Sequence, residues 1–297
     1  MARRALIAGW FSFPDGEATA GDLGAARVVA AWLRSAGVAH DVAYSPAFGD
    51  ALTLERADPS HYSDLIFVCG PASGRQLEVL LQRFSHCRRL AVGVSCPDRS
   101  CLELFDSVLA RDGLPGEPVR PDLALLDSDT VDERRDRWPT VAFVAANEQP
   151  EYGSAARHRE VHEVIEEFLA DQPVAVLDVD TRIDPRSRRQ RSANQVTGVL
   201  AKADLVVSTR LHGLVLGLSQ HRPVVAVDPI LGGAKVAAQC AALKWPAVVL
   251  PEELDYERLA DMLAFCQGPT SDKAVADSLR VARRRLQELG ADFEREL

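Results

Sequence analysis

The sequence predicts an α/β protein of two similar-sized domains with a cleft between them. Short apolar runs alternate with longer amphipathic segments, the pattern of buried parallel strands joined by crossover helices. This alternation stops between residues 111 and 139 and then restarts. The chain of 297 residues also suits two domains, since roughly 150 residues make one.

The first half predicts one parallel sheet with its helices. Its apolar runs are bounded by Gly, Pro and Asp, as buried strands are. Helices are expected where the apolar residues recur at helical spacing. We expect strands over residues 5–12, 41–45, 64–70 and 90–95, and helices over residues 22–35, 76–84 and 102–110.

The second half repeats the pattern after a linker. Residues 111–139 contain several prolines and a charge-dense run, which is typical of a connection between domains. The predicted domains are therefore residues 1–138 and 139–297. We expect strands over residues 140–145, 174–179, 204–208 and 223–227, and helices over residues 156–170, 193–203, 213–219 and 278–297.

Composition excludes several classes of protein. The formal charge of −9 argues against binding to nucleic acid. No run approaches the ~18 apolar residues that a membrane span needs, and we expect a cytoplasmic protein. No Cys-x-x-Cys pair occurs among the six cysteines, so we expect reduced thiols without a disulfide framework. Cys96 and Cys101 are expected to be buried and inert.

Arg210 and His212 are the strongest candidate site residues. They follow an apolar strand and lie where a helix begins, and open α/β sheets bind ligands beyond the carboxyl ends of their strands. Free N–H groups at a helix start favour an anion. Arg210 adds a bidentate cation, and His212 adds a group that titrates near neutrality. The alternative is a structural ion pair for Arg210 and a core position for His212.

Asp22 and Lys235 each have two interpretations. Asp22 stands at a predicted helix start, either as a base for an acceptor hydroxyl or as an N-cap. Lys235 follows a glycine-rich turn and either reaches a phosphate or is solvated. The arginine-rich residues 182–191 either attract a phosphorylated acceptor or form a solvated loop.

His158 and His162 are four residues apart on a predicted helix. This spacing can bind a metal, but the zincin pattern needs Glu where Arg159 stands. Histidine pairs without further ligands rarely make a metal site. We therefore expect a surface helix face here and no metal site.

Residues 203–235 resemble the C-terminal signature of the polysaccharide pyruvyl transferase family. In that family a strand ends in Ser-x-Arg-Leu-His before a short helix, a second strand and a downstream lysine. Ser208, Arg210, His212 and Lys235 match this pattern. The resemblance spans about residues 5 to 250 on the order of the elements. In the first half it rests on Gly21 with Asp22, residues 70–74 and residues 120–124.

The resemblance implies a GT-B-like fold, in which two Rossmann-like domains face a cleft. It implies transfer of a pyruvyl group from phosphoenolpyruvate to a sugar or glycoconjugate, giving a ketal. The donor side would be residues 139–297, and the acceptor side residues 1–138. No metal is required, and no cofactor beyond the donor substrate phosphoenolpyruvate. A homo-oligomer is an open option.

Roles for individual residues follow from the same resemblance. His212 would protonate the methylene carbon of the donor, and Asp22 would act on the acceptor. The substrate-binding residues would be Arg210, Ser208, Gly213, Lys235 and Gly21.

Two other functions stay open. A GT-B glycosyltransferase that uses a nucleotide sugar needs an acidic residue for the ribose hydroxyls, for which Asp228 or Glu252 is a candidate. A non-catalytic relative would bind a sugar or a partner without turnover. Ligand binding without product formation would indicate the non-catalytic relative.

Overall fold

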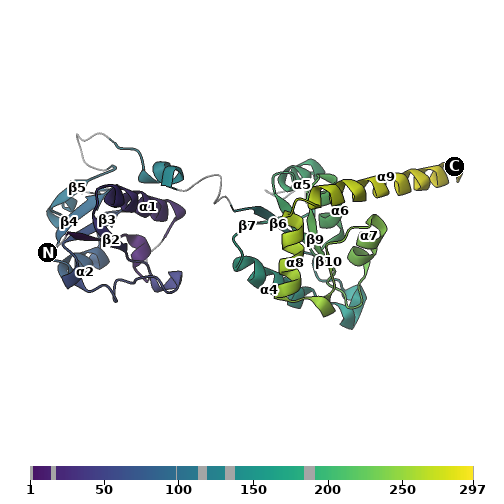
Figure 1. Ribbon diagram of the computed structural model, residues 1–297, viewed down its shortest axis with the longest axis horizontal. Coiled ribbons are helices and arrows are strands. Elements are labelled where there is room, and N and C mark those ends of the chain that lie inside the picture. The colour runs from purple at the N-terminus through teal and green to yellow at the C-terminus, as the bar shows by residue number, and fades with distance from the viewer. Residues whose placement is uncertain are drawn as a thin grey trace. The chain divides into compact units, whose positions relative to one another are not determined.

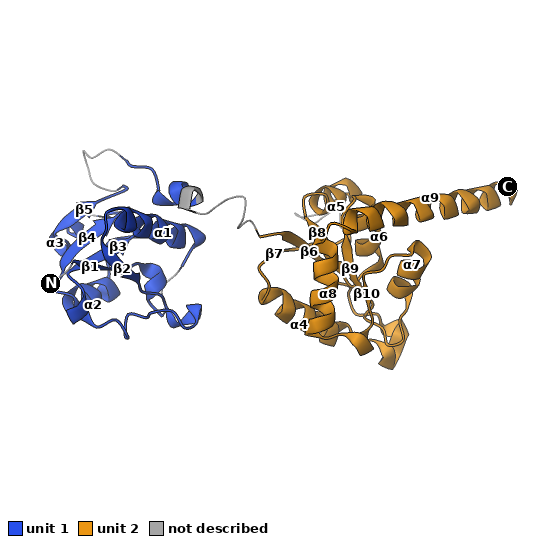
Figure 2. Ribbon diagram, in the orientation of Figure 1, with its two compact units in different colours: residues 1–137 blue, residues 138–297 orange. Residues whose placement is uncertain are grey.

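The computed structural model describes residues 3–14, 18–97, 99–112, 119–130, 138–183 and 191–296. The chain divides into two compact units, residues 1–137 and 138–297 (Figure 2). Each unit contains a parallel sheet with flanking helices (Figure 1). This confirms the predicted α/β class. The cleft between the domains and the boundary between residues 138 and 139 stay predictions.

Unit 1 contains a five-stranded sheet in the order β2-β1-β3-β4-β5. Alternate side chains of its strands enter two cores, as a doubly wound sheet requires. Leu6 and Phe67 pack with Leu77 of the second helix, whereas Ile7 packs on the other face with Val29 of the first helix. The strands are β1 (Arg4–Ala8), β2 (Ala39–Val42), β3 (Asp64–Val68), β4 (Arg88–Val92) and β5 (Ser107–Leu109), and the helices are α1 (Ala20–Ser35), α2 (Arg75–Arg83) and α3 (Cys101–Leu104).

Unit 2 contains a five-stranded sheet in the order β10-β9-β8-β6-β7. Counted within the unit and read from β7, this is the strand order of unit 1. Its strands are β6 (Thr140–Val144), β7 (Ala175–Asp178), β8 (Leu205–Ser208), β9 (Val224–Val227) and β10 (Val248–Val249). Its helices are α4 (His158–Ala170), α5 (Ala193–Leu200), α6 (Leu211–Ser219), α7 (Lys235–Leu243), α8 (Tyr256–Gln267) and α9 (Ser271–Arg295).

The helix predicted over residues 102–110 is wrong. The chain forms the short helix α3 and then the edge strand β5, which pairs in parallel with β4. A three-residue strand is too short for hydrophobic periodicity to separate it from a helix. The sequence analysis also missed β10, α7 and α8.

Part of the predicted linker belongs to unit 1. Residues Leu123–Thr130 form a 3₁₀ segment that packs along α1. Arg27 of α1 donates from Nε to Asp127 Oδ1 at 2.8 Å, and Gly21 approaches Ala124. The break in periodicity between residues 111 and 139 is therefore only partly a connection between units.

Cys96 and Cys101 form a disulfide, so the expectation of reduced thiols is wrong for this pair. The chain turns after β4 into α3, which brings their Cα atoms to 5.8 Å. That approach depends on the turn, and the cysteine spacing alone does not reveal it. The other four cysteines are buried and free, and burial raises the pKa of Cys240 and Cys266 to about 12.

Gly217 and Gly198 lie in two helices of unit 2 and differ in the space around them. A Cβ at Gly217 would lie 2.8 Å from Val224 Cγ2 and 3.1 Å from Val206 Cγ2, whereas nothing lies within 4 Å at Gly198. We expect Gly217→Ala to destabilise the protein by about 1–3 kcal/mol through overpacking. Gly198→Ala should instead stabilise it by about 0.5–1 kcal/mol, because alanine favours a helix interior. Urea unfolding measures both, and equal shifts would contradict the packing.

Candidate active site

The turn from β8 into α6 brings the strongest predicted residues to the carboxyl edge of the unit 2 sheet. Ser208 is fully buried, and its Oγ accepts the Arg210 N–H at 3.0 Å. The same Oγ lies 3.2 Å from the Val144 carbonyl oxygen and 2.9 Å from that of Arg210. A Cβ at Gly213 would collide with the Ser208 hydroxyl. Ser208 and Gly213, predicted to bind substrate, therefore lie buried inside the turn that shapes the site.

The N-terminus of α6 forms the candidate anion site. Arg210 is the N-cap residue, and no side chain caps the helix. The first N–H groups of any helix lack an intrahelical acceptor and carry its positive dipole end. His212 stands exposed in this first turn. The arrangement suits an anion beside a group that can give a proton.

The side chain of Arg210 is held by Asp180, which follows β7. Arg210 Nη1 lies 3.5 Å from Asp180 Oδ1, and the Arg210 side chain is 22% exposed. Nη1 is buried and makes no hydrogen bond to any residue that the structure describes. Hydrogen bonds from Arg182 are the main cause that lowers the pKa of Asp180. A partly exposed guanidinium whose donors are not all used by protein acceptors is well suited to an anionic oxygen.

Lys235 is the first residue of α7 and is exposed. Its Nζ lies 5.9 Å from the centre of the Tyr152 ring, within the range of a cation–π contact. Tyr152 comes from the segment after β6, and the chain that follows it pairs with the loop after β9, as Ala156 does with Ile230. Lys235 thus joins the same edge of the sheet as Arg210 and His212.

Asp228 and Glu252 hold the glycine-rich turn before Lys235. Asp228 is 1% exposed, and its carboxylate accepts the backbone N–H groups of Ile230, Ala234 and Ala237 at 2.8–3.1 Å. Glu252 Oε1 accepts the Gly232 N–H at 2.6 Å. Both carboxylates were candidates for binding ribose hydroxyls, and both are occupied with backbone donors.

The expectation that His158 and His162 form a surface face is wrong. His158 is 3% exposed, and neither of its ring nitrogens has a hydrogen-bond partner among the described residues. His162 Nε2 lies 2.8 Å from Thr209 Oγ1, beside Arg210. Helix α4 packs against α8, so one face of it is buried. His162 and Thr209 are 47 residues apart in sequence, and no local sequence pattern indicates their contact.

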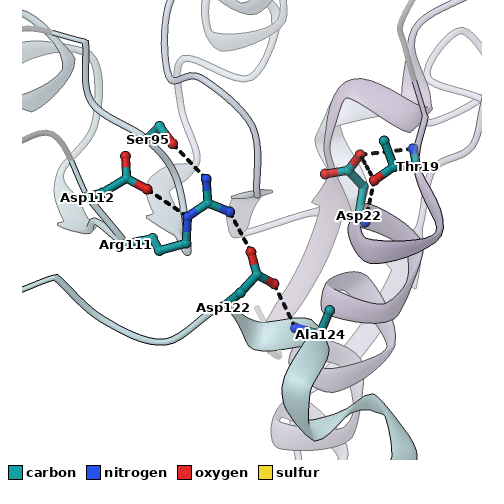
Figure 3. A network of polar contacts seen from close by, with 7 residues as sticks. All are labelled: Thr19, Asp22, Ser95, Arg111, Asp112, Asp122 and Ala124. Carbon is teal, nitrogen blue, oxygen red and sulfur yellow. Dashed lines mark hydrogen bonds and ion pairs between the residues drawn. The ribbon is translucent and has the colours of Figure 1, made fainter.

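In unit 1, Asp22 forms a capping box with Thr19, which is the N-cap of α1. Asp22 Oδ2 accepts the backbone N–H of Thr19 at 3.0 Å and its hydroxyl at 2.8 Å (Figure 3). The Thr19 Oγ1 in turn accepts the Asp22 N–H. Gly21 lies beside them in the first turn of α1. Asp22 is therefore not the N-cap residue itself, which is Thr19, but stands three residues later as the partner of Thr19 in the capping box.

Arg111 joins three segments at the carboxyl edge of the unit 1 sheet (Figure 3). Its guanidinium donates to Asp112 at 2.7 Å, to Ser95 at 2.9 Å and to Asp122. Asp122 Oδ1 also accepts the Ala124 N–H at 2.9 Å. Because two carboxylates surround one guanidinium, the charge of Arg111 is neutralised within this cluster. The sequence analysis named neither Arg111 nor Asp180, although both follow strand ends.

The remaining expectations concern the arginine-rich stretch, metal binding and membrane-spanning helices. Most of the arginine-rich stretch, residues 184–190, lies outside the described residues, and Arg182 pairs with Asp180 at 2.7 Å. Within the described ranges, no three His, Cys, Asp or Glu side chains come together as a metal site would require. None of the helices described is long and apolar enough to cross a membrane.

Comparison with known protein families gives a match over part of the chain. Residues 99–229 match the polysaccharide pyruvyl transferase family. The match confirms the resemblance over these residues, which include Ser208, Arg210 and His212, whereas Lys235, Gly21 and Asp22 lie outside it. It supports a transferase that modifies polysaccharide. No curated protein matches the chain.

Solved structures resemble the chain only distantly. The heptosyltransferase WaaC of E. coli, solved with ADP, is 16% identical, with 88% of this chain and 98% of that chain covered and a TM-score of 0.27. The glycotransferase of kitacinnamycin is 15% identical over 100% of both chains, with a TM-score of 0.35. A periplasmic sugar-binding protein from Legionella pneumophila is 13% identical over 89% and 94%, with a TM-score of 0.27.

The two histidines of α4 predict a loss of stability in mild acid. Burial lowers the pKa of His158 and His162, so the unfolded chain binds their protons first, near pH 6.5. The stability that the two neutral histidines contribute is therefore fully present above that pH. It is lost as the pH falls towards their lower pKa values in the folded state. We expect the melting temperature to fall less between pH 7.5 and 5.5 in His158→Phe than in the wild type. An identical pH profile would contradict this, and His86→Phe, at an exposed position of unit 1, is the control.

Proposed function

We propose that this chain transfers a pyruvyl group from phosphoenolpyruvate to a pair of sugar hydroxyls, forming a ketal. The observation that carries the proposal is Arg210. Its side chain is 22% exposed and Nη1 of its guanidinium makes no hydrogen bond to a described residue, and it stands at an uncapped helix N-terminus beside exposed His212. Phosphoenolpyruvate carries a phosphate and a carboxylate, and such anions suit this site. The family match over residues 99–229 supports the same reaction.

The chemistry assigns one task to each group. Arg210 and the first N–H groups of α6 bind the donor anion, and Lys235 adds a second cation at the same edge. His212 gives a proton to the methylene carbon, which becomes a methyl group and leaves an oxocarbenium-like centre. One sugar hydroxyl attacks this centre, phosphate leaves, and the second hydroxyl completes the ketal. One of the two hydroxyl protons replaces the proton given by His212, and the other leaves with the phosphate. The scheme uses no metal and no other cofactor.

The edge of unit 1 suits the acceptor. Arg111 is neutralised by Asp112 and Asp122, and Asp22 adds a further carboxylate nearby. Asp22 accepts from Thr19 through Oδ2, which leaves its other carboxylate oxygen to accept from a sugar hydroxyl, whereas a carboxylate repels a phosphate. The charges of the two units therefore support an anionic donor on unit 2 and a carbohydrate acceptor on unit 1.

The structure favours this reaction over nucleotide-sugar transfer. A ribose ligand would have to displace backbone donors from Asp228, whose two carboxylate oxygens accept N–H groups of the turn before Lys235 and of α7. Breaking such buried hydrogen bonds costs about 1–3 kcal/mol for each group left unsatisfied. A comparison of melting temperatures with phosphoenolpyruvate, uridine diphosphate and guanosine diphosphate separates the two functions, because a bound ligand stabilises the folded state.

Variants of Arg210 and His212 test the proposed roles. We expect Arg210→Ala to raise the Kd for phosphoenolpyruvate about 10- to 100-fold, because hydrogen bonds to charged groups contribute about 1.5–3 kcal/mol. His212→Gln should lower kcat about 100-fold or more while binding is kept, since it removes the proton donor. Calorimetry gives the Kd, and release of phosphate with the mass gain of a ketal gives the rate.

Matched controls keep this test specific. Arg280→Ala removes an exposed arginine of α9, and His61→Gln removes an exposed histidine of unit 1. Both should behave like the wild type. Full activity in the Arg210 and His212 variants would overturn the proposed roles. Binding of phosphoenolpyruvate without product, with saturating acceptors, would instead identify a non-catalytic relative.

A further inference from the structure

His162 connects helix α4 to the turn that carries Arg210 and His212. Its Nε2 lies 2.8 Å from Thr209 Oγ1, and Thr209 is 1% exposed. The same Oγ1 accepts the Ala146 N–H at 2.8 Å, at the end of β6. A single hydroxyl thus joins three segments of unit 2: the end of β6, helix α4 and the β8–α6 turn.

The donors and acceptors in reach indicate which atom donates in the hydrogen bond between Thr209 and His162. Thr209 has one hydroxyl hydrogen, and a buried donor needs an acceptor. Within the described part of the chain, His162 Nε2 is the acceptor in reach of Oγ1. Burial lowers the pKa of His162, with a smaller effect from His158, so the ring is neutral at pH 7 and its Nε2 can accept. The ring proton then stands on Nδ1.

We propose that His162 is a positioning residue for the donor site. It acts through Thr209, whose neighbour Arg210 binds the donor anion and whose turn presents His212. This inference rests on the proposed function, and it adds a residue outside the strand-end motif. His162 itself touches neither the donor nor the reacting atoms.

Packing alone is the competing explanation for His162. Its ring lies 6.1 Å from that of Phe143 and 6.3 Å from that of His158, measured between ring centres. A phenylalanine at position 162 keeps a ring there but has no nitrogen. Thr209→Val likewise keeps the shape of the side chain and removes the hydroxyl. These two variants therefore separate the hydrogen bond from the packing.

The experiment measures phosphoenolpyruvate affinity and kcat in His162→Phe, Thr209→Val and the double variant. We expect each single variant to raise the Kd about tenfold, as loss of one hydrogen bond of about 1.4 kcal/mol predicts. The double variant should be no worse than the single ones, because both remove the same contact. His162→Gln can place an amide near the position of Nε2 and should restore most of the affinity. Melting temperatures show that each variant is folded.

The control is His158→Phe, one turn earlier on the same helix, since no described residue hydrogen-bonds to the His158 ring. It should bind phosphoenolpyruvate like the wild type. Unchanged affinity in folded His162→Phe and Thr209→Val, or strictly additive losses in the double variant, would overturn the positioning role alone. A wild-type protein that binds no phosphoenolpyruvate would overturn the proposed function and this inference together.

Discussion

The candidate site depends on one close approach, that of Gly213 to Ser208 where β8 becomes α6. The hydroxyl of Ser208 occupies the space that a Cβ at Gly213 would need, and it also holds the Arg210 N–H. This contact starts α6 directly at the end of a buried strand, so its first N–H groups face the carboxyl edge of the sheet. A side chain at position 213 would push the helix away and move Arg210 and His212 with it.

The two units share a strand order but differ in the charges at their carboxyl edges. In unit 2 the helix start after β8 has no side-chain cap, and two basic residues, Arg210 and Lys235, come to that edge. In unit 1 the equivalent helix start, that of α2 after β3, also lacks a side-chain cap, but Arg111 at this edge is matched by two carboxylates. The same topology therefore offers a candidate anion site in one unit and an arginine paired with carboxylates in the other. An overall charge of −9 does not reveal this division.

Two acidic residues of unit 2 shape the candidate anion site through contacts within the protein. Asp180 holds Arg210, and Asp228 accepts backbone N–H groups from the turn before Lys235. Each carboxylate offsets the cost of ordering a charged side chain or a glycine-rich loop. In the sequence, such residues are indistinguishable from ligands of a substrate, because both follow the ends of strands.

The sequence by itself determined the α/β class, most of the strands and the position of Arg210 and His212 at a strand end. These features depend on local patterns: apolar runs, glycine and proline boundaries, and a strand that leads directly into a helix. Only the tertiary structure decided that residues 107–109 form an edge strand, that Cys96 meets Cys101, and that His162 reaches Thr209. Those contacts depend on how distant or turning segments pack, and a buried histidine has the same local pattern as an exposed one.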